Sequence, residues 1–196
     1  MSVLTIKIGN REYDMPKTKA ALLKVGKMWR KNARISLRKQ DKVNTGALYN
    51  SMPVNVFETP TAYAVDITPQ VHYWQFVDKG VQGASRNIFP YQSESPFKFG
   101  SGTGPRGLRG AIDKWVVQKN ISGTRDEKGQ FTTRKGLVYL ISNAIFNRGL
   151  KPSLFITRTK IQIQKHVVKT IAPAISSDMA NAVRQDLKRD PKLDVK

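Results

Sequence analysis

Two runs of alternating apolar and polar residues, separated by a short turn, most constrain what this chain can fold into. The runs fall within residues 53–67, and their alternate positions carry apolar side chains: Val54 and Val56, then Tyr63, Val65 and Ile67. Such alternation gives each strand one buried and one exposed face, which is typical of an antiparallel pair. Thr59-Pro60 supplies the turn, because proline fixes φ and has no N–H to donate. The stretch therefore predicts a β-hairpin that needs a cover on one face.

Helical periodicity predicts where this cover comes from. Apolar residues recur at helical spacing in three segments, which are 18–39, 108–120 and 134–148. We expect these helices to pack on one face of the antiparallel sheet. A further helical segment runs over 153–188, and Pro173 is expected to kink or split it because proline removes a backbone hydrogen bond.

Two more segments complete the expected fold. Residues 1–16 are predicted to form an N-terminal hairpin with Gly9-Asn10 as its two-residue turn. Residues 81–107 are rich in glycine, serine and proline, and they are expected to form a long irregular insertion arm. The fold class predicted from these elements is α+β, as a single domain over 1–196.

The insertion arm carries aromatic residues that a free linker would not need. These four residues are Phe89, Tyr91, Phe97 and Phe99. Aromatic side chains in an irregular segment indicate a contact that buries them. We expect them to bind a neighbouring subunit, and the alternative is an arm that folds back over its own sheet.

The charge balance is strongly basic, with 34 Lys and Arg against 14 Asp and Glu and a net charge of +20. One side of the helix at 18–39 is apolar, and another carries a basic stripe at steps of three and four: Lys24, Lys27, Lys31, Arg34 and Arg38. Like charges at these spacings repel one another, so an anionic partner would relieve that repulsion. Three partners remain open for the stripe: an acidic protein surface, DNA, or water alone.

Three short phrases in this order resemble the tail-completion, or head–tail connector, family of tailed bacteriophages. The first resembles V-(D/N)-T-G-x-L-x-x-S and is carried by Val43, Asn44, Thr45, Gly46, Leu48 and Ser51. The second resembles Y-x-x-(F/Y)-V-(D/E)-x-G and is carried by Tyr73, Phe76, Val77, Asp78 and Gly80. The third is the run Lys151-Pro152-Ser153-Leu154-Phe155-Ile156 ahead of the last helix.

The resemblance implies a structural virion protein of the phage neck, assembled in the host cytoplasm. Such a protein would form a homo-oligomeric ring of six or twelve copies that joins the portal or an adaptor ring to the tail proteins. DNA would pass through the lumen of this ring. The implied partners are therefore the neighbouring copies, the portal or adaptor, the tail, and DNA as a second partner for the basic stripe.

The residues themselves give little support to catalysis. Acidic residues are scattered along the chain, the two histidines (His72 and His166) lack an evident partner carboxylate, and there are no cysteines. We therefore expect neither enzyme activity nor a cofactor nor a metal site. No apolar run is long enough to span a bilayer, so no membrane partner is expected. The alternative function is that of a basic nucleic-acid-binding protein that caps or packages phage DNA.

Overall fold

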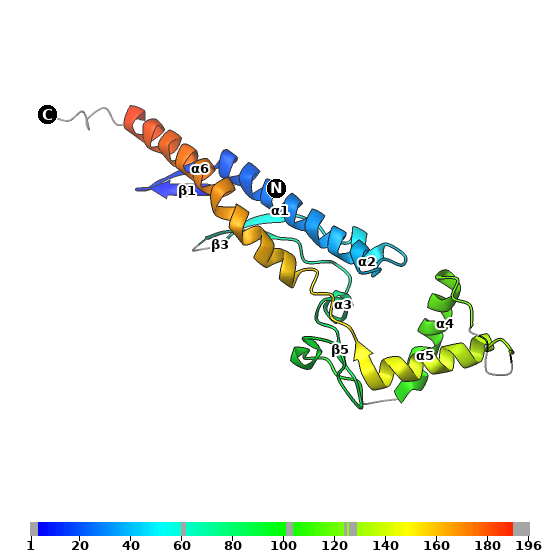
Figure 1. The fold of residues 1–196 in the computed structure, drawn as a ribbon. Coiled ribbons are helices and arrows are strands. Elements are labelled where there is room, and N and C mark those ends of the chain that lie inside the picture. Colours follow the sequence, from blue (N-terminus) through cyan, green and yellow to red (C-terminus); the bar gives the residue numbers. More distant parts are fainter. Residues whose placement is uncertain (1–3, 60–61, 101–103, 124, 126–128, 190–196) are drawn as a thin grey trace. The chain divides into compact units, whose positions relative to one another are not determined.

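The structure is a computed structural model that describes residues 4–59, 62–100, 104–123, 125 and 129–189. It combines helices with small antiparallel sheets, so the predicted α+β class is confirmed (Figure 1). The chain divides into two compact units, which are described separately below. The first unit consists of Met1–Ile35, Ser51–Gln70 and Ile156–Lys196, and the second of Ser36–Asn50 and Val71–Phe155.

Both predicted hairpins are present in the first unit. Strands β1 (Thr5–Ile8) and β2 (Arg11–Asp14) pair antiparallel around Gly9-Asn10, and Gly9 has a φ of 58°. Strands β3 (Asn55–Thr59) and β4 (Ala62–Asp66) pair with Val56 opposite Val65. Pro60, which was expected in the turn, lies outside the described residues.

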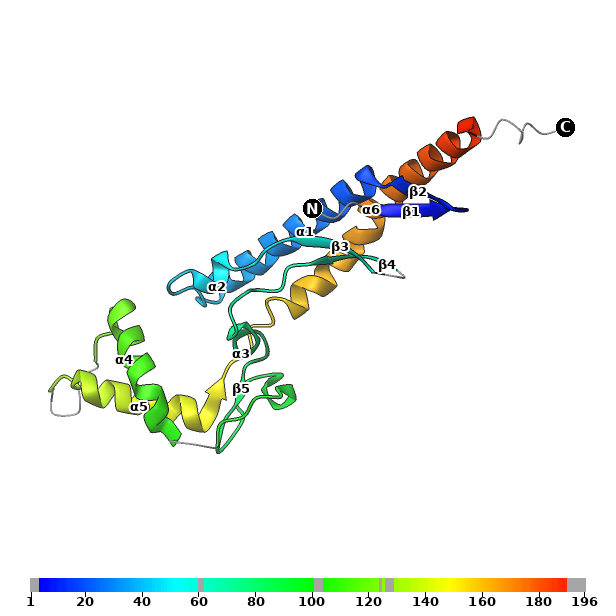
Figure 2. The ribbon, with the colours of Figure 1, turned by 180° about the vertical axis from the view of Figure 1, so that it is seen from behind.

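Two long helices cover these hairpins. Helix α1 (Pro16–Lys39) and helix α6 (Thr157–Arg189) run antiparallel, because Thr18 bonds to Asp178 while Trp29 bonds to Thr159 (Figure 2). The apolar stripe predicted for α1 is buried: Leu22, Val25, Trp29 and Ala33.

The core of the first unit lies between the helices and the hairpins. Leu4, Met15 and Leu22 form its centre, and Val56, Tyr63, Val65, Ile171 and Ile175 pack against them. Gly26 lets α1 approach the second hairpin closely, since a β-carbon there would lie 2.7 Å from the side chain of Val65. Each predicted strand face is thus used as the alternation indicated, with Val65 inward and Phe57 41% exposed.

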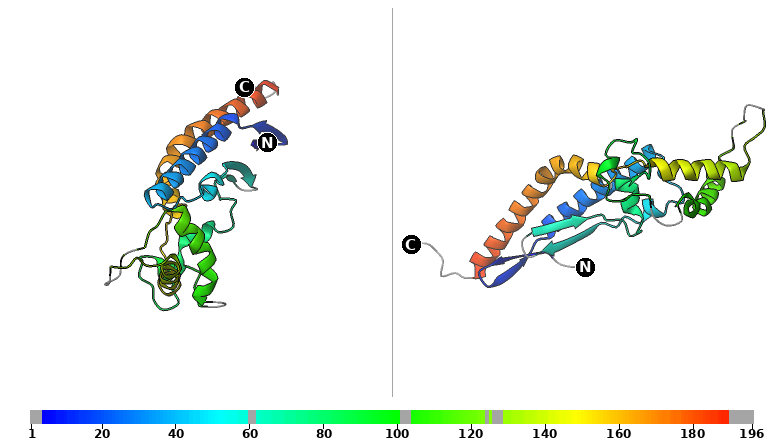
Figure 3. Two further views of the ribbon diagram at one scale, coloured as in Figure 1. Left: turned by 90° about the vertical axis from the view of Figure 1, so that its right-hand side faces the viewer. Right: turned by 90° about the horizontal axis from the view of Figure 1, so that it is seen from below.

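Two expectations about how the elements pack need correction. Helices α4 (Arg109–Gln118) and α5 (Arg134–Arg148) belong to the second unit and pack on each other, so the predicted cover of the hairpin from 108–120 and 134–148 is wrong. Periodicity indicates that a helix face is buried without identifying the surface that buries it. The six strands also form three separate two-stranded sheets within the described residues. Of the two outcomes expected from Pro173, a kink or a split, the structure shows no split: α6 stays one helix, and Figure 3 shows that it bends.

The second unit holds the remaining elements. It contains the short helices α2 (Ala47–Asn50) and α3 (Trp74–Lys79), and strand β5 (Val81–Gln82) paired with β6 (Gly149–Leu150). Between β5 and α4 the described part of the predicted arm is irregular apart from two 3-10 turns, η1 (Gln92–Glu94) and η2 (Gly104–Leu108), and an isolated bridge between Gln82 and Lys98. None of the helices that the structure describes is both long and apolar enough to cross a membrane.

Candidate functional site

The segments that carry most of the family resemblance come together in the second unit. They are the loop 43–48, the turn and helix at 73–80, and the segment 151–155, which are far apart in the sequence. We call the place where they meet the motif junction.

Hydrogen bonds join the second and third segments of the motif junction. Ser153 donates to the carbonyl of Val77 from its N–H at 3.1 Å and from its Oγ at 2.7 Å. Leu154 N–H donates to the carbonyl of Asp78 at 2.9 Å. These carbonyls lie in the last turn of α3, and the segment 151–155 thus binds the end of a helix, where backbone carbonyls need partners from outside the helix. Phe155 and Asp78 are almost fully buried beside these bonds.

Backbone geometry explains why two positions of the motif junction carry the residues they do. Gly80 has a φ of 71°, and a β-carbon there would lie 2.8 Å from the ring of Pro152, so only glycine fits. Leu154 has a φ of 51°, a left-handed conformation that costs a residue with a β-carbon about 1–2 kcal/mol. Its bond to Asp78 and the burial of Phe155 offset this cost.

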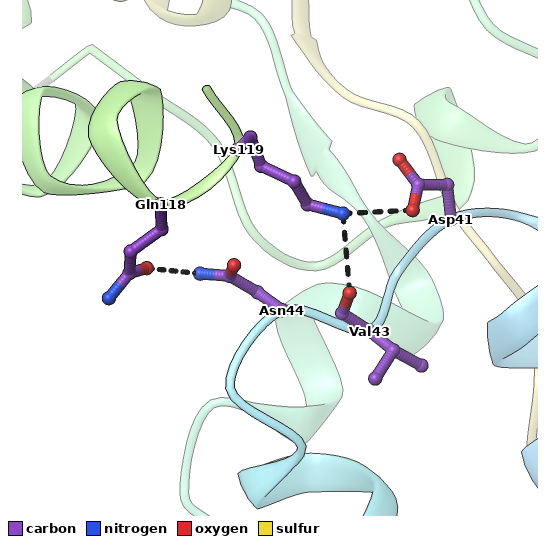
Figure 4. A network of polar contacts seen from close by, with 5 residues as sticks. All are labelled: Asp41, Val43, Asn44, Gln118 and Lys119. Atoms are coloured by element: carbon purple, nitrogen blue, oxygen red, sulfur yellow. Dashed lines mark hydrogen bonds and ion pairs between the residues drawn. The ribbon is translucent and has the colours of Figure 1, made fainter. Parts of the chain in front are cut away.

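The loop 43–48 is held by the end of helix α4 (Figure 4). Lys119 Nζ lies 2.9 Å from the carboxylate of Asp41 and donates to the carbonyl of Val43 at 3.3 Å. Asn44 Nδ2 donates to Gln118 Oε1 at 2.6 Å, so this amide contacts helix α4. Thr45 Oγ1 accepts a long hydrogen bond from the N–H of Ala47 at the start of α2, with 3.4 Å between nitrogen and oxygen.

A pocket of about 250 Å³ opens at the motif junction. Its walls are the loop from Lys42 to Tyr49 together with Tyr73 and Val77. The pKa of the Lys42 ammonium is lowered, first by its partial removal from water and then by the positive charge of Lys151. Lys42 is the one charged residue of this lining, which contains no carboxylate or histidine and therefore no acid–base pair of the usual kind.

The aromatic residues of the arm lie in different surroundings. The ring of Phe97 stands edge-on to Phe76, with centroids 4.4 Å apart, and the Phe99 ring lies 5.8 Å from that of Phe146. Phe89 is half-buried, whereas Tyr91 is 50% exposed. The rings of Phe97 and Phe99 are thus partly buried by contacts within the subunit, and Tyr91 is the most exposed of the four aromatic residues. Their role at a subunit interface stays a prediction.

A buried glutamine that the sequence did not reveal fixes the arm. Gln92 donates to the carbonyls of Val81 at 2.8 Å and Arg148 at 2.7 Å, and its Oε1 accepts from the N–H groups of Ile88 and Phe89. Glutamine in a polar loop is usually exposed, so no local signal distinguishes this one. The arm therefore has a defined shape although it contains little regular structure.

The basic stripe runs along α1 as predicted. Lys24, Lys27 and Lys31 are exposed and lie in the first unit together with Arg34, which is half-buried. Arg38 belongs to the second unit, where its guanidinium lies 4.7 Å above the ring of Tyr49. The exposed lysines are thus the part of the stripe best placed to meet a partner.

The structure shows no concentration of groups for metal binding. Within the described residues, no cluster of three or more His, Asp or Glu side chains could hold a metal ion. His72 is exposed and contacts Tyr73 edge-on, and His166 is exposed on α6. Comparisons of the chain with protein-family models, with curated proteins and with solved structures found no match.

Proposed function

We propose that this chain is a structural subunit of the neck of a tailed bacteriophage. Six or twelve copies would form a ring that joins the portal or an adaptor ring to the tail. The observation that carries the proposal is the motif junction. Parts of all three phrases meet there although they lie far apart in the sequence, which supports a fold shared with the family that the phrases resemble.

The chemistry of the motif junction also supports a structural role. Ser153 and Leu154 use their polar groups to bind the backbone of α3, and Gly80 is needed for close packing. In the motif junction, two backbone N–H groups and one hydroxyl therefore hold the segment 151–155 against the end of α3. A subunit that must fit the same neighbours many times in one ring needs such a rigid connection.

A pair of glycine variants tests whether the motif junction serves assembly. Gly80→Ala forces a β-carbon against Pro152, whereas a β-carbon at Gly110 in α4 meets no atom within 4 Å. We expect Gly80→Ala to abolish incorporation into particles and Gly110→Ala to leave it intact. The measurement is quantitative mass spectrometry of purified virions. Normal incorporation of a folded Gly80→Ala protein would contradict the proposal.

The exposed lysines of α1 favour a second candidate, a nucleic-acid-binding protein that caps or packages DNA. Lys24, Lys27 and Lys31 could neutralise phosphates along one side of the helix. Binding that depends on phosphate contacts weakens steeply as salt rises, by about three orders of magnitude or more between 50 and 200 mM for six contacts. A steep salt dependence of tight binding to duplex DNA would favour this candidate over the neck ring.

A further inference from the structure

Helix α6 carries an apolar stripe on its outer side that no part of the first unit covers in the described structure. The stripe consists of Ile161, Val168, Ala172, Met179, Val183 and Leu187. Five of these six side chains are large, and they are between 44% and 69% exposed. The inner side of the same helix is already used, since Thr159, Ile163, Asp178 and Ala182 are buried in the unit.

The spacing of the outer stripe is that of a helix-packing surface. From Ile161 to Val183 the steps are seven, four, seven and four residues. Because seven and four residues together make three helical turns, the stripe stays on one side of the helix and follows the bend of α6 (Figure 3). A helix of 33 residues is about 50 Å long, so the surface is long and narrow. This shape fits another helix.

The charges beside the stripe decide which helix it fits. Lys165 and Lys169 lie next to the stripe, and Arg184 follows Val183. The helix has two acidic residues, and both are used inside the unit: Asp178 accepts from Thr18, and Asp186 accepts from Tyr13 and Arg11. A second copy of α6 would bring cation against cation. An acidic helix would meet complementary charge on the same surface.

We propose that the outer stripe of α6 is a docking site for an acidic amphipathic helix of another protein. The partner would place aliphatic residues on the stripe and carboxylates beside Lys165 and Lys169. A lipid surface fits less well, because helices that bind membranes usually have a wide apolar face with aromatic residues, and this stripe is narrow and aliphatic. The exposure, the spacing and the flanking charges of the outer stripe support this docking site, and none of them depends on the proposed neck ring.

The probe is a synthetic peptide of about 25 residues with leucine at the same seven- and four-residue steps and glutamate beside them. One control peptide carries lysine in place of glutamate, and another has the same composition in scrambled order. Binding to the full chain is followed by fluorescence anisotropy at low and high salt. We expect micromolar binding of the glutamate peptide that weakens with salt, and much weaker binding of both controls.

A matched pair of variants locates the binding surface. Val168→Ser with Met179→Gln removes apolar surface from the stripe, and we expect it to weaken binding at least about tenfold. Gln162→Ser with Ala180→Ser changes exposed residues outside the stripe and is expected to bind as the unchanged protein does. Both variants should keep the melting temperature, because every changed residue is exposed.

Four results would overturn the inference. The first is no binding of the glutamate peptide up to millimolar concentration, and the second is equal binding of the three peptides. The third is self-association of the chain that Val168→Ser with Met179→Gln abolishes, which would make a second copy the occupant. The fourth is binding to vesicles of phosphatidylglycerol and phosphatidylcholine, lost in the same variant, without peptide binding.

Discussion

At the scale of single residues, Asp178 makes the clearest stabilising contact in the first unit. Its carboxylate accepts from the N–H of Thr18 at 2.7 Å and from Thr18 Oγ1 at 2.9 Å, and both residues are buried. Helix α1 has no acidic residue in its first turn, so a side chain from α6 satisfies a helix N-terminus that α1 leaves open. Sequence could not indicate this pairing, because the two residues are 160 positions apart.

Replacing Asp178 with alanine should therefore lower the free energy of unfolding by about 2–3 kcal/mol, since two buried donors lose their acceptor. Asp178→Asn should cost less because the amide oxygen can still accept. Urea denaturation measures the effect, with Ser176→Ala on the exposed side of α6 as the control. Equal midpoints for Asp178→Ala and the control would show that the bond to Thr18 contributes nothing.

Two other carboxylates should make stability depend on acidity. The pKa of Asp186 is lowered from 3.8, first by the hydrogen bond from Tyr13 and then by Arg11, and that of Asp113 is lowered chiefly by the hydrogen bond from Arg134. The folded protein then binds fewer protons than the unfolded chain below about pH 4, so the free energy of unfolding falls as pH falls through the folded pKa values.

Denaturation measured from about pH 5 down to about pH 2 should show this decline, and the double variant Asp186→Asn with Asp113→Asn should flatten it. An identical pH dependence in the two proteins would mean that other groups carry the acid sensitivity.

At the scale of elements, the arm combines a fixed backbone with aromatic residues of unequal exposure. Phe97 lies against Phe76, so Phe97→Ser should lower the free energy of unfolding by about 1–2 kcal/mol.

The side chain of Tyr91 is half exposed and its backbone is left-handed, with a φ of 61°, a conformation that asparagine tolerates. Tyr91→Asn should preserve the melting temperature while reducing incorporation into particles. A Tyr91→Asn protein that assembles normally would remove Tyr91 from the predicted interface.

A second prediction at this scale concerns the basic stripe of α1. We expect Lys24→Gln, Lys27→Gln and Lys31→Gln together to slow docking to the neighbouring ring and to reduce its salt dependence, with packaged DNA retained. The control changes three exposed lysines of the second unit in the same way: Lys98, Lys114 and Lys135. Kinetics of docking at several salt concentrations measure the effect. Normal docking would assign the stripe to solvent, and normal docking with DNA leakage would assign it to DNA.

Most elements could be predicted from local patterns, because alternation and helical periodicity report on backbone geometry directly. The hairpin around Gly9-Asn10 and the apolar stripe of α1 are examples. The helix over 153–188 was predicted, but not the exposure of its outer stripe, since a sequence does not tell which of two apolar faces its own chain will cover. Gln92 gave no signal, because its partners are backbone groups of distant segments.

At the scale of the whole molecule, the sequence indicated the class of fold better than its organisation. The chain was expected to place three helices over one sheet, yet α4 and α5 pack together in a separate unit. Local patterns do not reveal which surfaces meet over long sequence distances. Two of the phrases that resemble the family do contact each other, because Ser153 donates to the carbonyl of Val77 in the motif junction.

The central claim, a ring in the phage neck, is tested most directly by electron cryomicroscopy of necks purified from virions that contain this chain. Class averages viewed down the tail axis, combined with labelling of this subunit, give its number of copies and their symmetry. The account predicts a closed ring of six or twelve copies between the portal or adaptor and the tail. A single copy in the neck, or its absence from the neck of intact virions, would contradict it.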